Sequence, residues 1–149
     1  IKRTYNLMIG DRTAEEIKIN IGSAYLENNE HTYQVRGRDL VTGLPKNITI
    51  SEREVYEALQ DPVNSILDAI KICLEKTPPE LAADIMDRGI VLAGGGALLK
   101  GFDKLVAHQT GMPVHVTEEA LSCVAIGTGK VLENINTLRK LVVANKRIG

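Results

Sequence analysis

Three consecutive glycines, at residues 94–96, are the strongest chemical signal in this sequence. They follow a short apolar run at residues 89–93 that does not alternate, which predicts a strand covered on both faces. Glycine has no Cβ, so the backbone can approach a ligand closely, and the amides that follow favour an anion. The loop therefore suggests a nucleotide-type site. A tight turn between a strand and a helix is the alternative that the residues leave open.

Two common phosphate-binding motifs do not describe this loop. A Walker A loop needs Gly-Lys followed by Ser or Thr, but Phe102 follows Gly101. The dinucleotide fingerprint needs Gly or Ala at the sixth position counted from Gly94, where Leu99 stands. A nucleotide loop at this place would belong to neither class.

Glu15 and Lys18 form a second candidate pair. They are three residues apart in a predicted helix, so they lie on one face of it. A carboxylate can accept hydrogen bonds from ribose hydroxyls, and an ammonium can pack beside a purine ring. The alternative is an exposed pair that stabilises the helix by about 0.2–0.5 kcal/mol.

Other kinds of site find little support. His31, His108 and His115 are scattered, with no Cys or Glu at ligand spacing, so we expect no metal site. Cys73 and Cys123 are far apart in apolar helical patterns, which predicts buried, reduced thiols. A net charge of -1 provides no field that would attract nucleic acid.

The elements that must position these residues begin with a helix over residues 11–25. Thr13 and Glu16 have the spacing of a capping box at its start. Alternating residues at 32–36 and 47–50 predict two antiparallel strands. The residues expected on the buried stripe of the helix are Ala14, Ile17, Ile21 and Ala24.

A second capping box, Ser51 with Glu54, predicts a helix through Gln60. Asp61 and Pro62 then predict a new helix, with the Asp as N-cap and the Pro in the first turn. The residues expected on the core face of that helix are Ile66, Ala69, Ile70, Cys73 and Leu74.

The second half of the chain has the pattern of an α/β unit with a parallel strand pair. Two prolines at 78 and 79 break the chain, so a subdomain boundary is expected near residue 75. Gly127 and Gly129, inside the last helix, suggest close helix packing. The expected elements are helices over 80–87, 101–109 and 118–135, strands over 89–93 and 113–116, and a helical tail over 136–144.

The chain opens on Ile1 rather than Met, inside a segment that looks helical because Ile1, Tyr5 and Met8 share one face. We therefore expect it to be a piece of a longer protein. It contains no apolar run of about 18 residues, the length typical of a membrane-spanning helix.

Four blocks of sequence together resemble the superfamily of actin, Hsp70 chaperones and sugar kinases. Within it they resemble the MreB-type proteins, the bacterial actin-like cell-shape-determining group that includes MreB, Mbl and MreBH. The resemblance spans nearly the whole chain, and its first two blocks are specific to that family. The blocks are residues 5–10 with 13–18, residues 89–99, residues 110–114 and residues 123–129.

The resemblance implies an α/β fold, namely the C-terminal half of the actin-like ATPase (ribonuclease H-like) fold. Residues 1–75 would form the upper subdomain IIB, with helices and a small antiparallel sheet. Residues 76–149 would form most of the lower subdomain IIA. The nucleotide would lie in a cleft between two halves of the parent molecule.

The resemblance also implies a ligand, ATP with Mg²⁺. Contacts to the adenosine and the near phosphates fall on Gly94, Gly95 and Gly96, and contacts to the ribose and base fall on Glu15 and Lys18. The family's catalytic residues, metal-binding carboxylates and membrane-inserting elements would lie upstream of this chain. We therefore expect no catalytic residue and no metal ligand within it.

The function implied is that of a slow ATPase that polymerises into membrane-associated filaments in the cytoplasm, controls rod shape and directs cell-wall synthesis. Its partners would be copies of itself and proteins of the wall-elongation machinery. One alternative is the ATPase half of another actin-fold enzyme or of an Hsp70-like chaperone. Another is an interaction module that binds no nucleotide, in which the glycines form only a turn.

Overall fold

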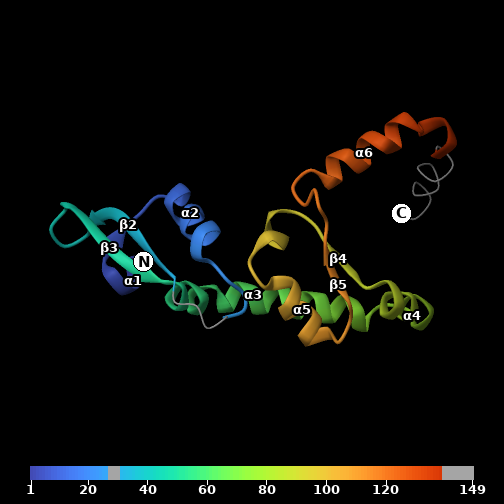
Figure 1. Ribbon diagram of the computed structural model, residues 1–149, viewed down its shortest axis with the longest axis horizontal. Helices are drawn as coiled ribbons and strands as arrows, with labels where there is room; N and C mark the ends of the chain where they lie inside the picture. The colour runs from blue at the N-terminus through green and yellow to red at the C-terminus, as the bar shows by residue number, and fades with distance from the viewer. Residues whose placement is uncertain (27–30, 139–149) are drawn as a thin grey trace.

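A computed structural model describes residues 1–26 and 31–138 of the chain. Two small sheets lie towards opposite ends of the molecule, and one long helix, α3, runs between them (Figure 1). The first sheet has the order β1-β2-β3 and the second consists of β4 and β5. Among the described residues, no helix has the length and apolar character needed to cross a membrane.

The first sheet comprises β1 (Leu7–Met8), β2 (Thr32–Asp39) and β3 (Pro45–Ser51), all antiparallel. The predicted pair of antiparallel strands is confirmed, although both are longer than the sequence indicated. Alternate side chains point to one face, where helix α2 (Asp11–Ile21) covers them. The buried members of this first core are Leu7, Ile17, Ile21, Val35 and Ile50.

The start of the chain differs from the prediction. Helix α1 (Lys2–Tyr5) is only four residues long, because Asn6 adopts the left-handed conformation at φ 51° and ends it. The next two residues form β1, so the helix expected to continue to Met8 is wrong. Tyr5 still packs against the first core.

Helix α2 is shorter than the predicted 11–25, and its expected capping box is wrong. The helix begins at Asp11 after Gly10, with no side-chain cap, so Thr13 already lies within its first turn. At the other end Gly22 is extended and stops the helix after Ile21. Three residues of the predicted stripe are buried, but Ala14 is exposed.

Helix α3 (Glu52–Glu75) begins at the predicted capping box. Ser51 is the N-cap: its Oγ accepts from the Glu54 amide at 3.3 Å, and its own amide donates to Glu54 Oε2 at 2.8 Å. The predicted break at Asp61 and Pro62 is wrong, because Pro62 lies inside one continuous helix. Packing of its buried face outweighs the one backbone hydrogen bond that a proline removes.

The face of α3 that packs is only partly the predicted one, since of the predicted residues Ile70 packs against the second core. Val63 and Leu67 are buried in a second core, whereas Ile66 is 48% exposed and Cys73 is also exposed. The predicted buried thiol at Cys73 is therefore wrong, and Cys123 is half-buried. The predicted face instead lines a shallow groove of about 460 Å³. Its lining includes Ile66, Ala69, Ile70, Cys73, Leu74, Ile85 and Ile90.

In the second half, helix α4 (Pro79–Arg88) leads to β4 (Ile90–Leu92), and α5 (Phe102–Thr110) leads to β5 (Val114–Val116). The two strands are parallel, as predicted, with Ile90 opposite Val114. Helix α5 packs on this sheet and contributes Phe102 and Val106 to the second core. Val91 is 63% exposed, so within the described residues one face of β4 is open and the prediction of a strand covered on both faces is wrong.

Helix α6 (Cys123–Glu133) starts later than predicted, because residues 118–122 form a turn. Side chains added at Gly127 or Gly129 would meet nothing within 4 Å, so the close packing expected there is absent from the described residues. Most of the predicted helical tail, residues 139–144, lies outside the residues that the structure describes.

The two ends of the molecule are joined at Ser23 and Lys100. The chain forms an isolated parallel bridge there, and the Ala24 amide donates to the Lys100 carbonyl at 2.8 Å. Ser23 is fully buried, and its Oγ donates to the Tyr25 carbonyl at 2.6 Å. The second core combines residues from both halves of the sequence: Ala24, Val63, Leu67, Phe102 and Val106. The division of the chain near residue 75 stays a prediction.

Candidate functional site

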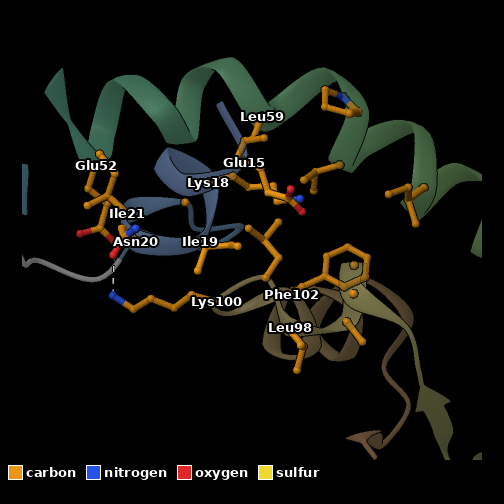
Figure 2. A pocket seen from close by; sticks show the side chains of 18 of the residues that line it. Glu15, Lys18, Ile19, Asn20, Ile21, Glu52, Leu59, Leu98, Lys100 and Phe102 are labelled. Atoms are coloured by element: carbon orange, nitrogen blue, oxygen red, sulfur yellow. Dashed lines mark hydrogen bonds and ion pairs between the residues drawn. The ribbon is translucent and has the colours of Figure 1, made fainter. Parts of the chain in front are cut away.

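A pocket of about 960 Å³ lies between helix α2, the turn after β4 and the middle of α3. Figure 2 shows α2 on one side of it, with Leu98 and Phe102 opposite and α3 along the top. Pockets that hold small molecules are commonly of this size, with mainly apolar walls and a few polar groups.

Helix α2 supplies one wall through Glu15, Lys18 and Ile19. These positions are three and four residues apart, so they share a face. Ile17 and Ile21 anchor the helix in the first core and thereby fix which face is turned to the pocket. The predicted pairing of Glu15 with Lys18 on one face is confirmed, and both side chains are exposed at the pocket.

The glycine loop supplies the opposite wall. Gly94 has φ 82°, which favours glycine, and its amide donates to the Ala120 carbonyl at 2.6 Å. The loop then continues as a short 3₁₀ helix, η1 (Gly95–Leu98), whose two glycines line the pocket. A Cβ at Gly96 would meet no atom within 4 Å, so this position borders open space.

The back of the pocket is apolar. Helix α3 contributes Leu59, Pro62 and Val63 to the lining, and Phe102 joins them from the start of α5. These residues belong to the second core or pack against it, except for Pro62. This wall of the pocket is therefore the surface of the second core, and its closely packed side chains suit a flat apolar group of a ligand.

At one end of the pocket, Glu52 and Lys100 form an ion pair, drawn as a dashed line in Figure 2. Lys100 Nζ lies 3.2 Å from Glu52 Oε1. Glu52 is only 2% exposed, and its second carboxylate oxygen, Oε2, has no hydrogen-bond partner in the described structure. Oε2 is thus enclosed by the protein, and the ion pair marks this end of the pocket.

Four of the five residues singled out in the sequence line this single pocket: Glu15, Lys18, Gly95 and Gly96. The fifth, Gly94, lies outside the lining and instead ties the loop to the turn before α6. Segments nearly 80 residues apart in the sequence are thus brought face to face, an arrangement that a turn alone does not require.

Sequence reasoning missed most of the apolar lining and the ion pair. Leu98 lies two residues after the last glycine, so its position in the loop was a usable signal. Glu52 and Lys100 are 48 residues apart, and no spacing rule connects them. Among residues 1–26 and 31–138, no group of three or more His, Cys, Asp or Glu could hold a metal ion.

Comparison with known sequences gives consistent matches over nearly the whole chain. A sequence profile described as MreB/Mbl protein matches residues 1–140. The cell shape-determining protein Mbl of Bacillus subtilis is 51% identical over 140 residues, which cover 94% of this chain and 42% of that protein. Cell shape-determining protein MreB of Escherichia coli K12 is 49% identical over 136 residues, covering 91% of this chain and 39% of that protein.

Solved structures agree with the sequence matches. MreB5 of Spiroplasma citri bound to AMPPNP superimposes with a TM-score of 0.87 at 40% identity, covering 94% of this chain and 42% of that one. The same protein bound to ADP matches equally well. A non-polymerising mutant of MamK, with a TM-score of 0.62 and 19% identity, shares the fold. The chain spans about two fifths of the length of the relatives it matches.

Proposed function

This chain belongs to the MreB/Mbl family and has part of the actin-like ATPase fold, and from that premise we propose that its pocket binds the nucleoside part of ATP. The observation that carries the proposal is the convergence of Glu15, Lys18, Gly95 and Gly96 on one cavity. Solved relatives hold AMPPNP or ADP, which supports a nucleotide as the ligand here.

Each wall has a distinct role in this proposal. The Glu15 carboxylate accepts hydrogen bonds from the ribose hydroxyls, and the Lys18 ammonium lies beside the base and offsets negative charge. The backbone at Gly95 and Gly96 passes close to the sugar and the near phosphate because no Cβ intervenes. The apolar wall of Leu59, Val63 and Phe102 shields the flat base from water.

The residues present fit a nucleoside better than a complete magnesium nucleotide. The pocket is large enough, and the free space at Gly96, together with the exposed Glu15 and Lys18, suits a polar, partly flat ligand. The described residues include no cluster that could ligate magnesium. Bound ATP would bring its own phosphates and Mg²⁺, and this chain's part would be to hold the adenosine.

At the level of the whole protein, we propose a shape-determining protein that polymerises into membrane-associated filaments in the cytoplasm and directs cell-wall synthesis. The support is that relatives are named cell shape-determining proteins. Slow hydrolysis of ATP would be coupled to assembly, with catalytic groups outside this chain. Partners would be further copies of the protein and components of the wall-elongation machinery.

The nucleotide assignment can be tested by calorimetric titration of ATP with Mg²⁺. The titration is made on this chain and on a hybrid in which it replaces the matching residues of the Bacillus subtilis relative. We expect micromolar binding to the hybrid and weaker binding to the chain alone, because the hybrid adds the rest of the cleft. Gly96→Val should lower the affinity of the hybrid by more than about tenfold, since Gly96 lines the pocket and a side chain there would occupy space that the ligand needs.

Gly10→Val is a matched control. Gly10 is exposed, extended at φ -86°, and a Cβ there would meet nothing within 4 Å, so the same change is made without touching the pocket. Glu15→Ala should also weaken binding. A hybrid that binds no ATP, or one in which Gly96→Val and Glu15→Ala both bind normally, would place the interaction module ahead of the nucleotide site.

A further inference from the structure

The two walls of the pocket are anchored in different cores. Helix α2, which carries Glu15 and Lys18, is held in the first core by Ile17 and Ile21. The glycine turn runs instead into Phe102, which is buried in the second core. The distance between the walls therefore depends on the links that join the two ends of the molecule at this place.

Lys100, two residues after the end of η1, makes two such links. Its backbone forms the isolated bridge with Ser23, and its carbonyl accepts from the Ala24 amide at 2.8 Å. Its side chain extends along one end of the pocket to Glu52, in the first turn of α3, as Figure 2 shows. The Glu52 amide in turn donates to the His31 carbonyl at 2.8 Å, just before β2. One residue thus connects the glycine turn to the end of α2 through its backbone and to the start of α3 through its charge.

These two links differ in how easily they can break. Ser23 is fully buried, and Gly101, with φ 71°, lies so close to the same segment that a Cβ there would meet Tyr25 Cβ at 2.9 Å. Buried backbone bonds at such a close contact are among the last to open. The Lys100 side chain is 44% exposed, so water can replace Glu52 as the partner of its ammonium. The backbone link is therefore suited to a pivot, and the ion pair to a contact that opens and closes.

The closed ion pair carries a cost that opening would relieve. Glu52 is 2% exposed, and its Oε2 is buried with no hydrogen-bond partner among the described residues. A buried carboxylate oxygen without a partner is unfavourable. Movement of this carboxylate away from Lys100 would admit water to both of its oxygens and offset part of the lost attraction. The open arrangement is therefore less unfavourable than the loss of the ion pair alone would make it.

We propose that the ion pair of Glu52 and Lys100 is a latch that holds the glycine turn near α2, and that its release opens the pocket about the bridge of Ser23 with Lys100. Lys100 is then a positioning residue, which acts through the place of the glycine turn and not through a bond to the ligand. The effect on nucleotide rests on the proposed function: a broken latch lets bound ATP leave faster, because an opened pocket encloses it less.

The first test measures the separation of the walls without nucleotide. Spin labels are attached at Ile19→Cys and Leu98→Cys in a version of the hybrid without other cysteines, and electron paramagnetic resonance gives the distance between them. The two positions are 71% and 57% exposed and line opposite walls. Glu52→Gln and Lys100→Met should lengthen or broaden the distance distribution. Lys100→Arg keeps the positive charge and should keep the distribution of the unmodified hybrid.

Lys46→Met is the matched control. Lys46 Nζ lies 3.1 Å from Asp39 Oδ2, and the two side chains are 46% and 12% exposed, so this pair is similar to the latch but joins β2 to β3 outside the pocket lining. Its loss should leave the label distance unchanged. The rate of ATP loss is then followed as a fluorescent ATP analogue is displaced by excess ATP. It should rise about two- to fivefold in Glu52→Gln and Lys100→Met, and not in Lys46→Met.

Unchanged label distances in Glu52→Gln and Lys100→Met overturn the latch, whatever the rates of nucleotide loss are. An equal change in Lys46→Met also overturns it, because any lost ion pair would then loosen the fold. If Lys100→Met does not fold because it leaves a buried charge unpaired, Glu52→Gln, which removes that charge, decides alone. A hybrid that binds no ATP overturns the proposed function, and the label distances by themselves then support or overturn the latch.

Discussion

Glu54 connects three parts of the first half of the chain through its carboxylate. It accepts hydrogen bonds from the Tyr5 hydroxyl, from the Ser51 amide and from the Ser51 hydroxyl. The hydrogen bond from Tyr5, followed by those from Ser51, lowers the pKa of Glu54 below its ordinary value of 4.5. The same contact raises the pKa of Tyr5 above 10.0. Both shifts favour the state with a charged Glu54 and a neutral Tyr5.

We predict that acid destabilises the chain partly through Glu54. A carboxyl group whose pKa is lowered by folding stabilises the fold above its unfolded pKa, and that stabilisation is lost as the pH falls through the folded value. The midpoint of thermal unfolding should therefore drop on going from pH 7 to about pH 3. In Glu54→Gln the midpoint at pH 7 should be lower and its dependence on acid pH shallower, measured by circular dichroism.

Asp39→Asn serves as a comparison at a separate site. Hydrogen bonds from the Thr42 and Val41 amides, and then the contact with Lys46, lower the pKa of Asp39 below 3.8, so its stabilisation is likewise lost as the pH falls through its folded pKa. Equal acid slopes in the unmodified chain and in Glu54→Gln would contradict the assignment. For Tyr5 the pH dependence has the opposite sign, because its pKa is raised by folding. Its stabilisation is present below pH 10 and is lost as the pH rises through the raised pKa.

The same residue scale explains which site residues could be predicted from the sequence. Glu15 with Lys18, and Gly95 with Gly96, are local patterns, and local patterns carry spacing information. The pairing of Glu52 with Lys100 depends on how two distant segments meet, which no spacing rule describes. Gly94 was predicted to contact the ligand; its amide donates to the Ala120 carbonyl and it lies outside the pocket lining, so that contact stays a prediction.

At the scale of elements, the cap of α3 gives a prediction with a matched control. Ser51→Ala removes the hydroxyl that accepts from the Glu54 amide and donates to its carboxylate. The free energy of unfolding should fall by about 1 kcal/mol, the usual cost of losing an N-cap. Urea unfolding followed by circular dichroism measures it.

Ser65→Ala is the control on the same helix. The Ser65 hydroxyl is exposed and donates to the carbonyl four residues earlier, at 2.9 Å, so it caps nothing. Alanine has the higher helix propensity, and this change should leave stability unchanged or raise it by a few tenths of a kcal/mol. Similar losses in the two variants would mean that the cap contributes no more than an ordinary helix position.

The two predicted capping boxes show why some helix starts were predicted correctly and others were not. Ser51 is the last residue of β3, which holds it extended at φ -97° and ψ 156°, so it can act as N-cap. Thr13 has the same spacing to Glu16, but the extended residue is Gly10, and the helix is already formed at Thr13. The motif specifies a possible cap, whereas the preceding backbone decides whether it is used. Pro62 wrongly indicated a break for a similar reason, because the packing of α3 determined the length of the helix.

At the scale of the whole molecule, α3 belongs to both ends of the structure. Its first turn is bonded to α1 through Tyr5, and its middle fills the second core. We predict that Leu67→Ala lowers the free energy of unfolding of the chain by about 2–5 kcal/mol, because the side chain is 4% exposed and leaves a cavity.

Ile66→Ala, one position earlier, is the natural comparison. Ile66 is 48% exposed on the groove side, so its replacement should cost less than about 1 kcal/mol. Chemical denaturation of both variants measures the two losses in free energy of unfolding. A larger loss of stability in Ile66→Ala than in Leu67→Ala would mean that the core face is the one that the sequence pattern indicated. That pattern could not distinguish the two because apolar residues occur on both sides of α3.

The length of α3 has a mechanical consequence. Its 24 residues make a rod about 36 Å long at the usual rise per residue. A tilt of roughly 5° displaces the far end of such a rod by about 3 Å. A small rotation of the helix at one sheet therefore shifts the residues at the other sheet by that distance. Sharp kinks in long helices occur most often at an internal proline. Pro62 is the internal proline of α3 and lies in the wall of the pocket, so a bend of the helix at this residue would change the shape of the site where a ligand would bind.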